Sequence, residues 1–69
     1  MKRRDLLKVI AQGARAAEKK VTLREGARHT VITVGSTTSI IARHREISSI
    51  LSTKIMKDFE PEFGKDWWK

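Results

Sequence analysis

The chain has 69 residues, with fifteen Lys plus Arg against eight Asp plus Glu, no Cys and four aromatic residues, and its formal net charge is +7. A chain of this length buries only about 60% of the surface that its unfolded form exposes, so it forms one domain around a thin core. Without Cys, disulfides and thiolate zinc sites are excluded. Apolar packing or a partner chain must therefore supply the stability.

The sequence shows no segment suited to a membrane or to secretion. The apolar stretch at residues 6–11 is broken by Lys8 and is too short for the core of a signal peptide. No run approaches the roughly 20 apolar residues of a membrane span. We therefore expect a soluble cytoplasmic protein that makes no contact with a membrane.

The charge is unevenly distributed along the chain. Residues 1–45 hold eleven basic and three acidic residues, a net charge of +8, whereas residues 46–69 have a net charge of −1. A basic excess confined to one part of a small domain favours a polyanionic ligand, nucleic acid above all. The alternative is a solvated basic face without a specific ligand.

A first helix is predicted over residues 4–19, because apolar residues recur at spacings of three and four. Gly13 is its weak point, since glycine costs about 1 kcal/mol relative to alanine inside a helix. The helix could end or bend there, although the Ala-rich continuation argues that it goes on. The apolar stripe comprises Leu6, Leu7, Ile10, Ala14 and Ala17.

Beyond residue 20 the apolar period changes to two, which predicts short antiparallel strands. Turn chemistry at residues 25–27 and 35–36 separates the strands. A sheet of this size is stable only when one face is covered, and the flanking helices are the available cover. The three predicted strands are residues 21–24, 30–34 and 37–42.

A second helix follows, with Ser48 or Ser49 as its cap and Pro61 as its end. Its predicted apolar face comprises Leu51, Ile55 and Phe59, with Ile50 and Met56 alongside. The fold class is thus α+β, with the order αβββα and a three-stranded antiparallel sheet covered by two helices.

The tail at residues 62–69 has no periodicity and receives no predicted structure. It contains the adjacent Trp67 and Trp68. This pair could stack on bases or enter a groove of a partner. Alternatively, one of the two could fold back to cap the small core.

His29 is the first candidate for chemistry, because histidine is the side chain that changes charge near neutral pH. It follows the first turn and begins the second strand. There it could take a proton from an RNA 2′-hydroxyl or protonate the leaving 5′-oxygen, while Arg24 and Arg28 neutralise the phosphate. No metal is needed for that reaction. The alternative is a surface histidine without a catalytic role.

The second candidate segment is Arg43-His44-Arg45-Glu46, between the last strand and the second helix. Its two arginines could clamp a phosphate with charge-assisted hydrogen bonds. It could equally be a solvated loop with a partial ion pair between Arg45 and Glu46.

Several segments together resemble the HicA-type toxins, small ribonucleases of bacterial and archaeal toxin–antitoxin systems. Residues 2–10 (Lys-Arg-Arg-Asp-Leu-Leu-Lys-Val-Ile) are similar to the first helix of that family. Gly26-Ala27-Arg28-His29 occupies the place of its Gly-Ser-x-His motif, and residues 41–47 resemble its Val-Pro-x-His-type segment. Leu51, Ile55 and Met56 look like its closing Leu-x-x-Ile-Leu pattern. Ala27 and Ala42 stand where the family commonly has Ser and Pro.

The resemblance implies a double-stranded-RNA-binding-like αβββα fold, cleavage of mRNA without a metal or other cofactor, and inhibition by a HicB-type antitoxin. Residues 1–59 would form the toxin domain and residues 60–69 an extension. By position, the catalytic histidine of the family falls on His29. The expected RNA-binding residues are Arg24, Arg28, Arg43, His44 and Arg45.

Two other functions stay open on the sequence. A non-catalytic module could bind RNA or DNA with the same basic face, since shape and 2′-hydroxyl recognition needs no titrating group. Alternatively, the protein could act chiefly through a protein partner that contacts the acidic tail and Trp67-Trp68.

Overall fold

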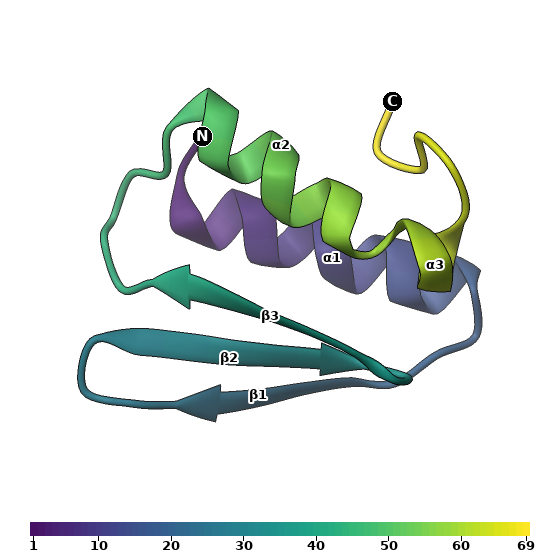
Figure 1. Ribbon diagram of the computed structural model, residues 1–69, viewed down its shortest axis with the longest axis horizontal. Coiled ribbons are helices and arrows are strands. Elements are labelled where there is room, and N and C mark those ends of the chain that lie inside the picture. The colour runs from purple at the N-terminus through teal and green to yellow at the C-terminus, as the bar shows by residue number, and fades with distance from the viewer.

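The computed structural model describes residues 1–69 as one helix, a three-stranded sheet and two further helices (Figure 1). This order confirms the predicted α+β class and the αβββα arrangement, to which a short third helix is added. No helix has both the length and the apolar character needed to span a membrane. The elements are α1 (Arg3–Ala16), β1 (Val21–Glu25), β2 (His29–Val34), β3 (Thr37–Ala42), α2 (Ser49–Asp58) and α3 (Glu60–Phe63).

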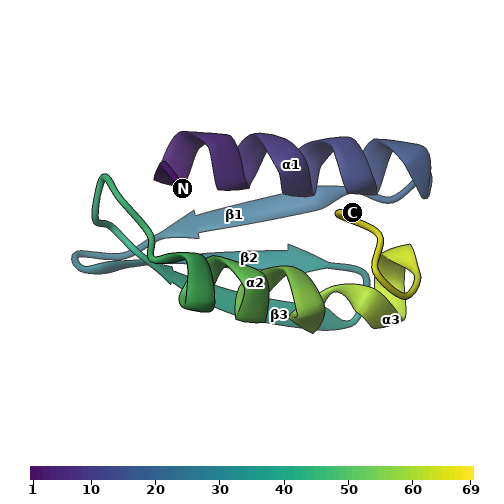
Figure 2. The ribbon, with the colours of Figure 1, turned by 90° about the horizontal axis from the view of Figure 1, so that it is seen from above.

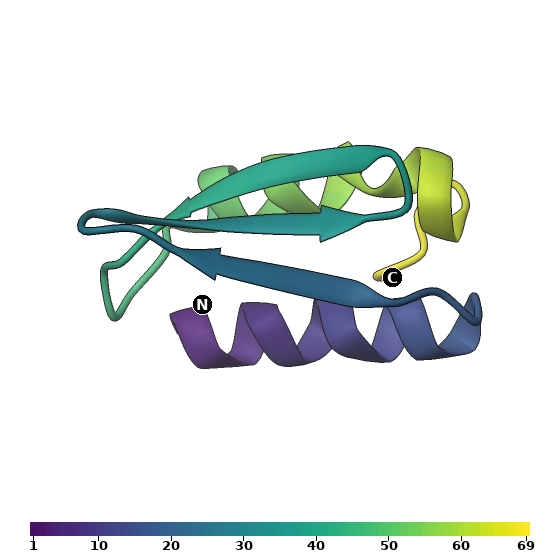
Figure 3. The same cartoon turned by 90° about the horizontal axis from the view of Figure 1, so that it is seen from below.

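The sheet has the order β1-β2-β3 with both pairings antiparallel. Helices α1 and α2 lie side by side on one face of it, and Figure 3 looks onto the opposite face, which no helix covers (Figures 2 and 3). Because side chains alternate along a strand, Thr30, Ile32 and Val34 point to the helices and are buried. Ile40 of β3 lies on the open face and is 58% exposed.

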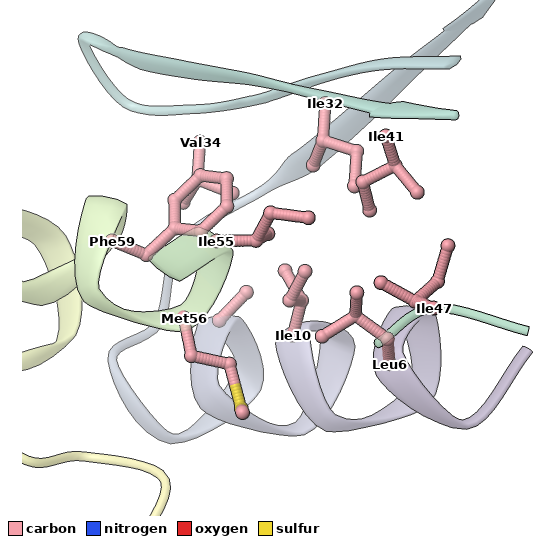
Figure 4. Close-up of a cluster of buried hydrophobic side chains, with 10 residues drawn as sticks. Leu6, Ile10, Ile32, Val34, Ile41, Ile47, Ile55, Met56 and Phe59 are labelled. Atoms are coloured by element: carbon pink, nitrogen blue, oxygen red, sulfur yellow. The ribbon is translucent and has the colours of Figure 1, made fainter. Parts of the chain in front are cut away.

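Ten buried apolar residues fill the space between the sheet and the helices, and most of them are labelled in Figure 4. Phe59, at the end of α2, is the largest of the fully buried side chains. Full burial of one such side chain is worth about 1.5–3 kcal/mol. The ten are Leu6, Ile10, Ala14, Ile32, Val34, Ile41, Ile47, Ile55, Met56 and Phe59.

Helix α1 continues through Gly13 and ends at Ala16, three residues before the predicted end. The chain reverses at Glu18, whose φ of 57° lies in the left-handed region. Gly13 has a packing role. A β-carbon at this position would lie 2.8 Å from Cζ3 of Trp67 and 3.0 Å from Cδ2 of Phe63. The missing side chain is what allows the C-terminal tail to approach α1.

Helix α2 is capped by Ser48, whose hydroxyl accepts a hydrogen bond from the Leu51 N–H at 3.2 Å. The predicted apolar face was wrong at its start, because Leu51 is 38% exposed and Ile50 is 85% exposed. Ser52 is buried instead. The face that meets the core therefore runs through positions 52, 55, 56 and 59, the spacing of one helical stripe.

The prediction that Pro61 ends α2 was also wrong in detail. Helix α2 ends at Asp58 with Phe59 as its C-cap, and Pro61 occupies the first turn of α3. Proline is tolerated there because the first N–H groups of a helix have no partner within the helix.

The tail after α3 folds back onto the core. The Trp67 indole N–H donates a hydrogen bond to the Met56 carbonyl at 2.7 Å, and its ring meets Phe63 edge-on at 4.7 Å between centroids. Trp67 and Trp68 are both partly buried against the core cluster. Of the two interpretations of this pair, the capping one matches the structure.

Candidate functional site

The candidate site lies at the end of the sheet where β1 turns into β2 and where β3 leaves the sheet. His29 begins β2 and is paired with Ala42, the last residue of β3. The Gly26 N–H donates to the His29 carbonyl at 2.8 Å, and the Arg43 N–H donates to the Arg28 carbonyl at 3.1 Å. Strand pairing thus brings together two motifs that are far apart in the sequence.

These two motifs line a shallow hollow of about 520 Å³. Arg28, His29 and His44 are exposed to solvent, so a ligand can reach them. Ala27 and Ala42 are among the lining residues, and each contributes only a methyl group. The lining residues are Ala27, Arg28, His29, Ala42, Arg43 and His44.

Glu25 organises the side chains behind this hollow. The Thr30 hydroxyl donates a hydrogen bond to the Glu25 carboxylate and in turn accepts one from the Arg3 guanidinium. Arg3 Nη2 lies 3.4 Å from Glu25 Oε1, and Arg43 Nη2 lies 3.7 Å from Glu25 Oε2. The pKa of Glu25 lies below its ordinary value, first because of the Thr30 hydrogen bond and then because of the two guanidinium charges. The carboxylate is therefore ionised at neutral pH and holds both arginines.

The two arginines of the hollow are in different states. Arg43 donates from Nη1 to the Gly26 carbonyl at 3.0 Å and is paired with Glu25, so its position is set and its charge is partly compensated. Arg28 takes part in no ion pair or side-chain hydrogen bond. Arg28 is accordingly the cation of the hollow that is free to bind an anion.

Two of the predicted RNA-binding residues lie outside the hollow. Arg24 lies on the open face of β1, opposite Val31 of β2. His29 and Val31 share that face, so Arg24 is a diagonal neighbour of His29 across the strands. Arg45 lines a separate cleft with Lys2, Arg3 and Arg4.

Sequence reasoning missed Arg3 and Glu25, which position the site without lining the hollow. The basic run at residues 2–4 was visible in the sequence. Nothing local indicated that Arg3 would reach Thr30 and Glu25, which are more than twenty residues away. The structure contains no group of three or more His, Asp or Glu side chains arranged to hold a metal ion.

Comparisons with protein-family models, with curated proteins and with solved structures found no match.

Proposed function

We propose that this protein is a metal-independent endoribonuclease of the HicA kind, the toxin of a type II toxin–antitoxin system, which cleaves mRNA in the cytoplasm. The observation that carries the proposal is the hollow in which His29 and His44 accompany Arg28 and Arg43. It combines groups that can transfer a proton with cations that can hold a phosphate.

The reaction uses a nucleophile from the substrate. The RNA 2′-hydroxyl attacks the adjacent phosphorus, the bond to the 5′-oxygen breaks, and the products end in a 2′,3′-cyclic phosphate and a 5′-hydroxyl. A neutral His29 imidazole accepts the 2′-hydroxyl proton, and the imidazolium then protonates the departing 5′-oxygen. Arg28, which has no competing carboxylate, stabilises the charge that builds up on the phosphoryl oxygens.

The neighbouring residues hold the strand in place. Arg43 is oriented by Glu25 and Gly26 and offers a fixed positive charge at the rim of the hollow. His44 can hydrogen-bond a phosphate oxygen from the same rim. Arg24 continues the positive surface along the open face of the sheet. Substrate therefore meets cations on both sides of His29.

An acidic antitoxin of the HicB type is the proposed protein partner. The chain has a net charge of +7, and Arg28 and His29 are exposed at the hollow. An acidic surface laid over this end would be steered there by charge and would block the substrate.

A non-catalytic RNA-binding module is the second candidate. It is favoured by the spread of cations beyond the hollow, to Arg24 on one side and Arg45 on the other. Such a surface could hold a strand through its phosphates without any proton transfer.

The test is incubation of the purified protein with an end-labelled RNA oligonucleotide in EDTA, beside a DNA oligonucleotide of the same sequence. We expect RNA to be cleaved and DNA to resist, because DNA lacks the 2′-hydroxyl. His29→Ala should lose about 10²–10⁴-fold in rate.

The matched control is Lys20→Ala, an exposed cation outside the hollow that forms no ion pair. It should cleave at the parent rate. Cleavage by His29→Ala at the parent rate would overturn the role of His29. If the protein binds RNA in a salt-sensitive way but yields no cleavage product, the nuclease is overturned and the non-catalytic binding module is supported.

A further inference from the structure

We propose that Lys2, Arg3, Arg4 and Arg45 form a second phosphate-binding subsite, the N-terminal basic cleft, which holds a backbone phosphate of the same RNA strand that enters the His29 hollow. The cleft has a volume of about 220 Å³, and all four residues that line it are basic. The identity of the strand as RNA rests on the proposed function. The site itself rests on the arrangement of these four cations.

Backbone hydrogen bonds between the start of the chain and residues 45–47 bring the four cations together. The Arg3 N–H donates to the Arg45 carbonyl at 2.9 Å, and the Ile47 N–H donates to the Met1 carbonyl at 2.8 Å. The N-terminal amino group donates back to the Ile47 carbonyl at 3.0 Å. The start of the chain is thus held against the loop that follows β3, and the cleft is preorganised for its ligand.

The protein itself compensates little of the charge in this cleft. Arg3 is paired with Glu25, and Arg4 makes only a distant, exposed contact of 3.9 Å with Asp5. Lys2 and Arg45 form no ion pair. Arg3 Nε is also buried without a hydrogen-bond partner. The remaining positive charges of the cleft repel one another, and a bound phosphate would offset part of this repulsion.

The start of α1 adds to the positive potential. Lys2 is the N-cap of this 14-residue helix and offers no side-chain hydrogen bond to the first turn. The positive end of the helix dipole favours anions. Asp5 supplies one negative charge in this first turn, whereas Lys2, Arg3 and Arg4 bring three positive charges to it, so the start of the helix keeps an excess of positive charge.

The cleft and the His29 hollow are neighbours. Arg3 donates to the hydroxyl of Thr30, the residue after His29, and shares Glu25 with Arg43 of the hollow. Arg45 follows Arg43 by two residues, so their α-carbons are at most about 7 Å apart. Figure 3 shows the N-terminus beside this end of the sheet. The cleft and the hollow thus lie at the same end of the sheet, with Arg3 on the side of the helices and His29 on the open side. An RNA strand that passes around this end would place one phosphate at Arg28 and another in the cleft.

The experiment measures the affinity for a labelled single-stranded RNA against salt concentration, in a His29→Ala background that prevents cleavage. We expect Lys2→Ala with Arg45→Ala to weaken binding about tenfold at low salt. The slope of log K against log salt should fall by about 0.7 for the one lost phosphate contact. A dinucleotide, which fills only the hollow, should bind with equal affinity to His29→Ala and to the variant that also carries Lys2→Ala and Arg45→Ala.

The charge-matched control is Lys20→Ala with Lys57→Ala, two exposed lysines without ion pairs outside both clefts. Equal weakening by the two double variants would overturn the subsite, because net charge alone would then explain the loss. The proposed function is tested separately. If the parent protein never cleaves RNA, but Lys2→Ala with Arg45→Ala lowers the affinity more than the control pair does, the subsite is supported and the nuclease is overturned.

Discussion

Each end of the sheet contains one glutamate that binds neighbouring polar and basic side chains, and the two glutamates differ in exposure and in partners. At the site end, formed by residues 25–29, 42–47 and 1–4, the Glu25 side chain is 51% exposed and is paired with Arg3 and Arg43. At the tail end, formed by residues 34–37, 59–69 and Lys19, the Glu62 side chain is only 7% exposed. Glu62 accepts hydrogen bonds from Lys19 and Thr37, both at 2.7 Å.

The balance of charge separates the two ends. At the tail end two of the three lysines are paired, Lys19 with Glu62 and Lys69 with Asp66, only Lys65 has no ion pair, and aromatic rings cover the core. At the site end, Lys2, Arg28 and Arg45 have no carboxylate partner. We therefore expect the tail end to determine stability and the site end to determine ligand binding. Substitutions at the two ends should have separable effects.

The largest expected effect is at the site end. Arg28→Ala should lower the rate of RNA cleavage about 100-fold, because it removes the cation that stabilises charge in the transition state. Its stability should change by no more than about 0.5 kcal/mol, since the side chain is exposed and makes no contact that supports the fold. Cleavage kinetics and urea unfolding check the two statements. A large loss of stability would show that the ends are not separable.

The complementary change at the tail end is Trp67→Ala. It removes a partly buried ring and its hydrogen bond to the Met56 carbonyl, so we expect a loss of about 2 kcal/mol in the free energy of unfolding. Trp68→Ala is the matched control, because this indole makes no such bond, and it should cost less than half as much. The RNA affinity of the folded fraction should stay at the parent value in both variants. A loss of affinity in Trp67→Ala alone would show that the tail end influences ligand binding at the site end.

A smaller effect tests the contact between α1 and the tail. Alanine normally favours a helix by about 1 kcal/mol over glycine. At Gly13 the added methyl would lie 2.8 Å from Trp67, so Gly13→Ala should fail to stabilise the parent protein. In a Trp67→Ala background only Phe63 still crowds the added methyl, at 3.0 Å, so the same change should be more favourable than in the parent, by up to about 1 kcal/mol. Thermal unfolding of the four proteins measures this difference between the backgrounds, and an equal effect in both would contradict the packing role of Gly13.

The smallest effect concerns acid. The pKa of Glu62 lies below its ordinary value, mainly because Lys19 and then Thr37 donate hydrogen bonds to the carboxylate. A depressed folded-state pKa contributes stability that is complete above about pH 5 and is lost as the pH falls through the folded-state value. Glu62→Gln should therefore lower stability at pH 7 and flatten its decline in acid. Glu18→Gln, an exposed glutamate without an ion pair, should leave the acid profile unchanged. A profile unaltered by Glu62→Gln would show that the tail end contributes nothing to acid sensitivity.

Local patterns predicted the elements well where one physical signal dominated. The period of two after residue 20 and the two turn segments predicted three strands, and the serine at position 48 is the helix cap. The apolar spacing wrongly predicted that Leu51 would be buried, because a second face of α2, which contains Ser52 in place of Leu51, has the same helical spacing. Which face is buried depends on how the helix meets the sheet. Gly13 was likewise interpreted by propensity alone, whereas its role depends on a ring 54 residues away along the chain.

The sequence by itself determined the αβββα order, the concentration of positive charge in the first 45 residues, and the presence of two histidines in two basic segments. Periodicity, turn chemistry and charge are properties of neighbouring residues, so they can be found without a structure. Only the tertiary structure decided that His29 and His44 line one hollow, that Glu25 holds Arg43 at the rim of this hollow, and that Arg45 joins the N-terminal cations instead. These groupings arise from the pairing of β2 with β3 and of residue 3 with residue 45, and such long-range pairing leaves no local trace in the sequence.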